Sequence, residues 1–84
     1  MNETKIEKAV DNFYTVMKTV LEEYKYDTIA LLNKKEEVEL IGKLIDVTDN
    51  YIELDDNKVR FYYPTSLIHI IRIKENMVNI FLDI

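Results

Sequence analysis

The first 25 residues carry apolar side chains at alternating intervals of four and three residues. The six positions are Ile6, Val10, Phe13, Met17, Val20 and Tyr24. Side chains at this spacing lie on one face of a helix, and the charged residues between them belong on the face that meets water. The pattern therefore predicts a single helix over about residues 3–25.

After Tyr26 the period changes from helical to extended. Short stretches of alternating apolar and polar residues are separated by clusters of Asn, Asp, Lys and Pro that are typical of turns. The pattern predicts strands over residues 28–33, 37–47, 51–55, 59–63, 67–73 and 77–84. Because the intervening segments are too short for crossover connections, we expect consecutive strands to pair as an antiparallel meander.

Gly42 is the only glycine, and it lies where the alternation within residues 37–47 changes parity. Glycine lets a strand bend without a Cβ clash, so we expect a bend or bulge there. A chain of 84 residues supports one hydrophobic core. We therefore predict one domain over residues 1–84 of the α+β class. In it, the N-terminal helix precedes a five- or six-stranded, strongly bent antiparallel β-barrel over about residues 28–84.

The segment from Val38 to Leu54 resembles the first Sm motif of Sm-like and Hfq-like proteins. The motif positions are occupied by Gly42, Leu44, Val47, Ile52 and Leu54. The resemblance implies a small barrel of the SH3/Sm kind, assembly into an oligomer, and RNA as a ligand. The Tyr-Lys-His run through which the Hfq branch contacts RNA has no counterpart in residues 61–69. The RNA-contacting residues of the family are therefore not assigned here.

The composition argues against catalysis. There is no Cys, and there is one His (His69) and one Ser (Ser66), which leaves almost nothing for a nucleophilic triad or a thiolate zinc site. A single glycine excludes a Walker-type phosphate loop and a dinucleotide-binding fingerprint. We therefore expect a protein that is not an enzyme and that uses no cofactor and no metal.

The chain is acidic, with a net charge of −5 at pH 7 and a sequence pI near 4.8. This charge disfavours non-specific contact with phosphate backbones and with anionic membranes. No apolar run approaches the roughly 20 residues needed to span a bilayer. Because residues 1–5 also lack the pattern of a signal peptide, we expect a cytoplasmic protein with no membrane partner.

Two groups of polar residues have an ordinary structural interpretation. His69 stands in an apolar strand, so we interpret it as a strand residue that is partly buried or at a subunit contact. Four acidic residues flank one predicted hairpin, namely Asp46, Asp49, Asp55 and Asp56. Their spacing matches no calcium loop, and turns favour Asp for local hydrogen bonds. We therefore interpret these four residues as turn-forming.

Aromatic and basic residues provide the candidate binding surface. Tyr62 and Tyr63 are adjacent in a predicted strand, so one of them must face away from the core. Exposed Tyr beside Arg or Lys can anchor a protein partner or stack on nucleobases. The predicted surface consists of Tyr62, Tyr63, Arg60, Arg72 and Lys58, and we favour a protein over a nucleic acid as its partner.

Two features predict self-association. A 20-residue helix is ~30 Å long, which exceeds the width of a small barrel. Part of the helical seam is therefore expected to meet another chain, and the predicted oligomer interface comprises Ile6, Val10, Phe13, Met17, Val20 and Tyr24. The last predicted strand, 77–84, has high β propensity and one charge. It must pair within the fold or across subunits. We expect a homo-oligomer.

The function predicted from these features is a non-enzymatic, oligomeric binding module. Its preferred role is a protein-interaction adaptor or inhibitor built on an Sm-like barrel, and its acidic surface could also mimic nucleic acid toward a basic partner. One alternative is an Sm/Hfq-like RNA-binding protein. A second is a small-ligand-binding oligomer or an enzyme with a cleft between subunits, whose candidate groups are His69 and the acids of residues 46–56.

Overall fold

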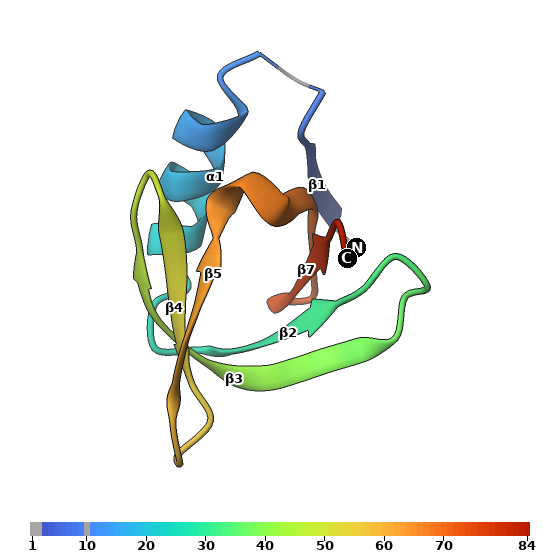
Figure 1. Cartoon of the computed structure of the whole chain (residues 1–84). Coiled ribbons are helices and arrows are strands. Elements are labelled where there is room, and N and C mark those ends of the chain that lie inside the picture. Colours follow the sequence, from blue (N-terminus) through green and yellow to red (C-terminus); the bar gives the residue numbers. More distant parts are fainter. Residues whose placement is uncertain (1–2, 10) are drawn as a thin grey trace.

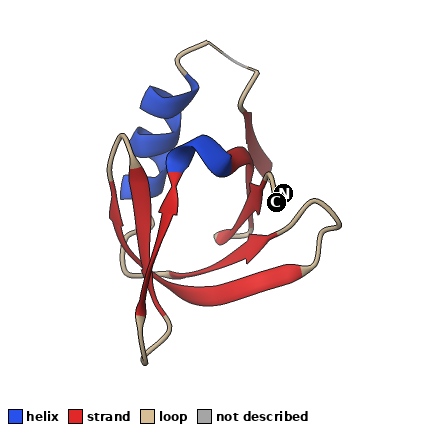
Figure 2. Cartoon of the chain, in the orientation of Figure 1, coloured by secondary structure: helices blue, strands red, loops and turns tan. Residues whose placement is uncertain are grey.

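The computed structural model of the chain describes residues 3–9 and 11–84. Strands account for most of the chain, and helical segments are few and short (Figures 1 and 2). In chain order the elements are β1 (Glu3–Glu7), α1 (Phe13–Glu22), β2 (Thr28–Leu32), β3 (Val38–Val47), β4 (Tyr51–Asp55), β5 (Arg60–Pro64), the 3-10 helix η1 (Thr65–Leu67), β6 (Ile68–Lys74) and β7 (Met77–Leu82).

The described strands form one sheet in the order β1-β6-β7-β2-β3-β4-β5. Strands β2 and β7 pair in parallel, and every other pair is antiparallel. Because β1 and β5 stand at opposite ends and do not pair with each other, the sheet is bent but open (Figure 1). The predicted α+β fold with a closed antiparallel barrel is therefore wrong. The protein is mostly β, with a seven-stranded mixed sheet and one small α-helix.

The predicted helix over residues 3–25 is also wrong in its first half. Residues Glu3–Glu7 form β1, which pairs with β6 so that Ile6 lies opposite Ile71. The helix begins at Phe13, directly after Asn12, whose φ of 56° is left-handed. Only Ile6 is apolar in β1, and pairing with β6 both buries that side chain and covers an open strand edge. Val10 lies outside the described residues.

The core lies between α1 and the inner face of the sheet. Phe13 and Met17 of the predicted seam are buried, whereas Val20 and Tyr24 are half-buried and Leu21, four residues after Met17, is the third buried residue of α1. The sheet contributes buried apolar residues from most of its strands, namely Ile6, Ile29, Leu31, Leu44, Val47, Ile52, Leu54, Ile68, Ile71, Ile73, Val78, Ile80 and Leu82. The predicted helical seam therefore packs on the sheet of its own chain.

The predicted strands after Tyr26 are confirmed within one or two residues at each end. The buried positions Ile52 and Leu54 of β4, and alternate residues of β7 up to Leu82, agree with the pattern. Alternation along the predicted strands 59–63 and 77–84 would also place Val59 and Ile84 on the inner face. Val59 instead precedes β5 with more than half of its surface exposed, and Ile84 follows β7 and is also exposed.

The last strand β7 is central in the sheet. It pairs with β6 on one side and with β2 on the other. The strand predicted over residues 77–84, which needs a partner on its edges, therefore pairs its backbone groups within one chain. In the portion of the chain that the structure describes, no helix combines the length and apolar character that crossing a membrane requires.

Candidate functional site

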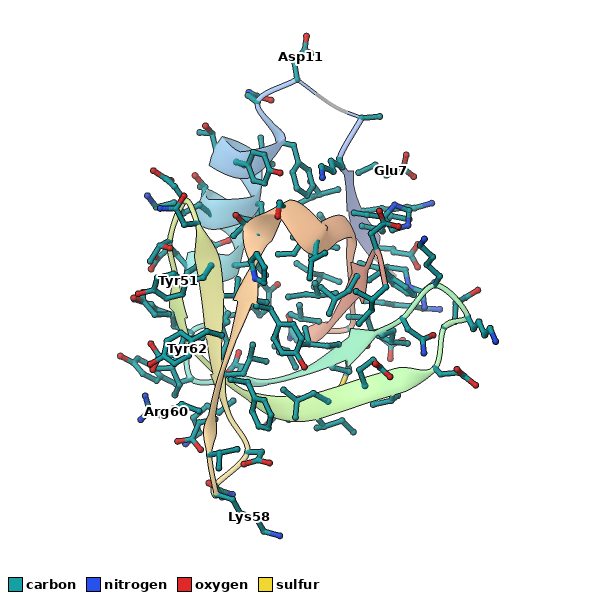
Figure 3. The ribbon with its side chains drawn as sticks, viewed as in Figure 1. Glu7, Asp11, Tyr51, Lys58, Arg60 and Tyr62 are labelled. Atoms are coloured by element: carbon teal, nitrogen blue, oxygen red, sulfur yellow. The ribbon has the colours of Figure 1, made fainter. Side chains whose placement is uncertain are left out.

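The five residues of the predicted binding surface lie in two separate places. Lys58, Arg60 and Tyr62 belong to the β4–β5 hairpin, where Tyr62 and Arg60 project from its outer side and Lys58 stands at its tip (Figure 3). Tyr63 faces the other way, is half-buried and packs against the core. Arg72 is on β6, from which β5 is separated by four intervening strands. No single surface therefore unites the five residues.

The outer face of the β4–β5 hairpin is a connected polar and aromatic cluster. The rings of Tyr51 and Tyr62 meet edge to face, with centroids 5.4 Å apart. The Arg60 guanidinium donates to the carboxylate of Glu53 and, over 3.1 Å, to Asp55. Hydrogen bonding to the Glu53 carboxylate raises the pKa of both Tyr62 and Arg60. At neutral pH the phenol of Tyr62 is therefore a hydrogen-bond donor, and the Arg60 charge is already matched.

The two edges of the sheet differ in character. The outward positions of β1 carry only charged residues, Glu3, Lys5 and Glu7, which discourage the addition of another strand. On β5 the outward positions carry Arg60, Tyr62 and Pro64, and Tyr62 is 58% exposed. Within the described residues β5 pairs with β4 alone. Its other side is therefore an aromatic strand edge open to solvent.

The turn at the tip of this hairpin is held by its own carboxylates. Asp56 Oδ1 accepts hydrogen bonds from the backbone N–H groups of Lys58 (2.9 Å) and Val59 (3.0 Å). Asp55 Oδ1 accepts one from Asn57 (2.7 Å). These backbone donors, that of Val59 first, lower the pKa of Asp56. The interpretation of Asp55 and Asp56 as turn-forming residues is confirmed.

The predicted oligomer interface consists largely of core residues. Ile6, Phe13 and Met17 are buried within one chain, and Val20 and Tyr24 are half-buried against the same core. Side chains in these positions already have packing partners. The seam therefore supplies no ready surface for a second copy, and the homo-oligomer stays a prediction without this support.

A second site, which the sequence did not indicate as a unit, lies on the outer face of the sheet. The turn between β2 and β3 folds toward β6 and β7 and encloses a cleft of about 290 Å³. The backbone N–H of Lys34 donates to the Ile84 carbonyl over 3.1 Å, which fixes the turn beside the end of β7. The cleft has polar walls made by Lys5, Asn33, Lys34, Glu36, His69 and Arg72, and apolar surface from Ile70 and Phe81.

Arg72 is the most unusual side chain of this cleft. Its guanidinium carbon lies 5.5 Å from the centre of the Phe81 ring, a cation–π arrangement. The Nε atom is buried and has no hydrogen-bond partner, and no described carboxylate forms an ion pair with Arg72. Buried polar groups are normally satisfied. Arg72 is therefore a cation of the cleft whose charge no described carboxylate matches.

His69, interpreted from the sequence as partly buried or at a subunit contact, is exposed in the cleft. Simple alternation along residues 67–73 would place it on the same face as Leu67 and Ile71. The pairing register of β6 with β7 instead shifts between Ile68 and Ile70, so that Ile68 and Ile71 are buried and His69 faces outward. Hydrophobicity gives no signal for this shift, because residues 70 and 71 are both Ile.

Among residues 3–9 and 11–84, no three His, Asp or Glu side chains are grouped as a metal site would require.

No protein-family model, curated protein or solved structure matches this chain. The resemblance of residues 38–54 to the Sm motif therefore stays a prediction about family.

Proposed function

We propose that this protein is a non-enzymatic protein-interaction module whose binding surface is the β5 edge together with the outer face of the β4–β5 hairpin. The observation that carries the proposal is the open, aromatic edge of β5, with Tyr62 exposed at its centre. An extended segment of a partner can add to such an edge through main-chain hydrogen bonds. Tyr62 and Tyr51 provide rigid aromatic surface beside it.

The cluster favours a partner segment with basic residues. Residues 51–64 contain three carboxylates, Glu53, Asp55 and Asp56, against the two cations Lys58 and Arg60. Arg60 is already paired with Glu53 and Asp55. The same pairing counts against the RNA alternative at this surface, because phosphate contacts need uncompensated cations.

The proposed binding mode specifies the partner's sequence pattern. Alternate residues of an added strand project to opposite faces of the sheet. Residues on the outer side would lie beside Arg60 and Tyr62, with Glu53 and Asp55 one strand further away on β4. A long Lys or Arg side chain that lies over the exposed Tyr62 ring is expected there. Residues on the other side would lie beside Phe61 and Tyr63, which are half-buried on the core side of β5. Apolar, β-branched residues are expected at those positions.

The test is selection from a library of short random peptides displayed against the purified chain. We expect enriched peptides to alternate basic with β-branched residues, and we expect their binding to slow hydrogen exchange in β5. Tyr62→Ala should weaken the selected peptides at least about tenfold, as loss of an aromatic anchor does. Tyr26→Ala is the matched control, because Tyr26 is 66% exposed and belongs to the connection between α1 and β2, which bonds to β3 and is separated from β5 by β3 and β4.

Three outcomes would overturn this proposal. In the first, the enriched peptides are acidic or lack alternation, and in the second, Tyr26→Ala weakens them as much as Tyr62→Ala does. In the third, sedimentation equilibrium finds that the free protein forms a dimer that Tyr62→Ala dissociates, which would show that a second copy and not a partner protein occupies the edge.

A further inference from the structure

We infer that the cleft between the β2–β3 turn and the outer face of β6 and β7 binds the carboxylate group of a small organic ligand, with Arg72 as its principal contact. This site is separate from the β5 edge and does not depend on the function proposed for that edge.

The charge of Arg72 has no carboxylate partner among the described residues. Arginine holds a carboxylate through two parallel N–H···O bonds from its planar fork. The Nε of Arg72 is buried and therefore out of reach of a ligand in the cleft, so the two terminal nitrogens of the guanidinium would make this contact where Arg72 lines the cleft. The Phe81 ring packs against the guanidinium, 5.5 Å from its central carbon. A carboxylate would supply the partner that the described residues do not.

The two lysines of the cleft are each paired with a nearby carboxylate. Lys5 Nζ lies 3.0 Å from a Glu7 oxygen, and Lys34 Nζ lies 3.2 Å from an Asp83 oxygen. Both pairs are about half exposed or more, so each is weak and can exchange its partner at little cost. Either ammonium group can therefore turn toward an anion that enters beside Arg72.

The turn that forms one wall of the cleft is held by its own hydrogen bonds. Asn33 Oδ1 accepts hydrogen bonds from the backbone N–H groups of Lys35 (2.9 Å) and Glu37 (3.0 Å), while Asn33 Nδ2 donates to the Glu37 carboxylate (3.0 Å). Together with the bond from Lys34 to the Ile84 carbonyl, these contacts hold the turn in place. A pre-formed wall lowers the entropy cost of binding.

The volume and apolar surface of the cleft indicate what kind of body the carboxylate is attached to. A cleft of about 290 Å³ is at the lower limit of small-molecule sites. Its apolar surface is provided by Ile70 and Phe81, which lie opposite each other on β6 and β7. A compact apolar or aromatic body attached to the carboxylate fits this surface.

The charges around the cleft favour a monoanion. Glu36 lies in its wall, and Glu7 and Asp83 stand beside the two lysines. These three carboxylates equal in number the three cations Lys5, Lys34 and Arg72, of which only Arg72 has no carboxylate partner among the described residues. One negative charge therefore matches the one unpaired cation, whereas a doubly charged phosphate would leave a charge unmatched. The ligand class is therefore an organic carboxylate and not a phosphate ester.

The test is an NMR titration of the full chain with benzoate, with neutral benzamide and with inorganic phosphate. We expect benzoate to produce saturable amide shifts in residues 33–36 and 69–72, and to raise the midpoint of thermal unfolding as a bound ligand does. Benzamide and phosphate should produce neither effect. Arg72→Lys should weaken benzoate binding about tenfold or more, because the ammonium cannot form the two-pronged contact.

A pair of turn variants provides the control and keeps the test decisive if Arg72→Lys fails to fold. Lys34→Met should weaken benzoate binding, whereas Lys35→Met, one residue along the same turn and outside the cleft, should leave it unchanged. Shifts with phosphate but not with benzoate would overturn the carboxylate assignment. The whole inference would be overturned by benzoate shifts that do not saturate, that fall elsewhere, or that respond equally to both lysine variants.

Discussion

The backbone of Gly42 in β3 lies directly against the carbonyl group of Asp55 at the end of β4. A Cβ atom at residue 42 would stand 3.0 Å from the Asp55 oxygen and 3.3 Å from its carbonyl carbon. The φ of Gly42 is not positive, so space and not backbone conformation requires glycine at this position. The contact sets how closely the end of β4 approaches its neighbour β3.

We predict that Gly42→Ala lowers the free energy of unfolding by about 1–3 kcal/mol, the range for overpacking a close contact. The neighbouring group is backbone and cannot rotate aside. The measurement is urea denaturation followed by circular dichroism. Lys43→Ala, at the exposed next position, should change the value by less than about 0.5 kcal/mol. Equal values for the two variants would show that the strands separate freely at this point.

A second prediction tests the place of the helix in the fold. Met17 is completely buried between α1 and the sheet. We expect Met17→Ala to lower the free energy of unfolding by about 2–5 kcal/mol, with no change in the sedimentation coefficient of the folded protein. Thr15→Ala, on the exposed side of α1, should cost less than about 0.5 kcal/mol. If Met17→Ala kept its stability and dissociated an oligomer, the helix would belong to an interface.

How far the sequence predicts this fold differs between its two halves. After Tyr26, alternation and turn residues located six strands, because each strand buries one face and ends at a polar turn. Before it, Ile6 and Val10 continue the spacing of Phe13 and Met17, and so a longer helix was predicted. Pairing with β6, which no local pattern encodes, decides that residues 3–7 are a strand.

The bend in β3 was predicted correctly in kind and misplaced in position. The register of β3 shifts at Glu39, opposite β2, and again between Leu44 and Asp46, opposite β4, so the irregularities lie at Glu39 and Ile45 and not at Gly42. Gly42 serves the contact with Asp55 instead. A parity change shows that a strand contains an extra residue, but it cannot distinguish which of several residues is displaced.

The two candidate sites also differ in how far the sequence predicts them. The hairpin cluster could be predicted because Arg60 and Tyr62 share one strand. The cleft could not be predicted, because it combines β1, β6 and β7 with a turn that only the parallel pairing of β2 with β7 brings beside them. Arg72 was selected for its charge and grouped with residues of β5, from which four strands separate it.

A third prediction concerns the junction of β5 and β6. Thr65 is a buried polar residue whose Oγ1 donates to the Asp49 carbonyl over 2.7 Å, and its N–H donates to the Asn50 carbonyl over 2.9 Å. Thr65→Val keeps the shape and removes the hydroxyl, which leaves a carbonyl without its donor. We expect a loss of about 1–2 kcal/mol in the free energy of unfolding.

The comparison variant for this prediction is Thr65→Ser, which retains the hydroxyl and removes a methyl group. The hydrogen bond to Asp49 matters if denaturant unfolding ranks Thr65→Ser above Thr65→Val in stability. The opposite ranking would mean that the methyl group, and not the hydroxyl, stabilises this junction.

A fourth prediction concerns acid sensitivity. Backbone N–H groups of Val59 and Lys58 lower the pKa of Asp56 below its usual 3.8. A carboxyl whose pKa is lower in the folded chain binds fewer protons folded than unfolded, so it stabilises the fold above that usual pKa. This contribution is lost as the pH falls through the folded pKa. The hairpin therefore loses stability on acidification below about pH 4.

Two substitutions separate the charge of Asp56 from its hydrogen bonds. Asp56→Asn keeps an acceptor oxygen for Val59 and removes the titration, so the difference in stability between about pH 7 and pH 3 should become smaller than in the wild type. Asp56→Ala also removes the acceptor, and it should lower stability at both pH values. Urea midpoints at the two pH values measure both effects. An acid dependence that is identical in Asp56→Asn and the wild type would assign the loss of stability to other carboxylates.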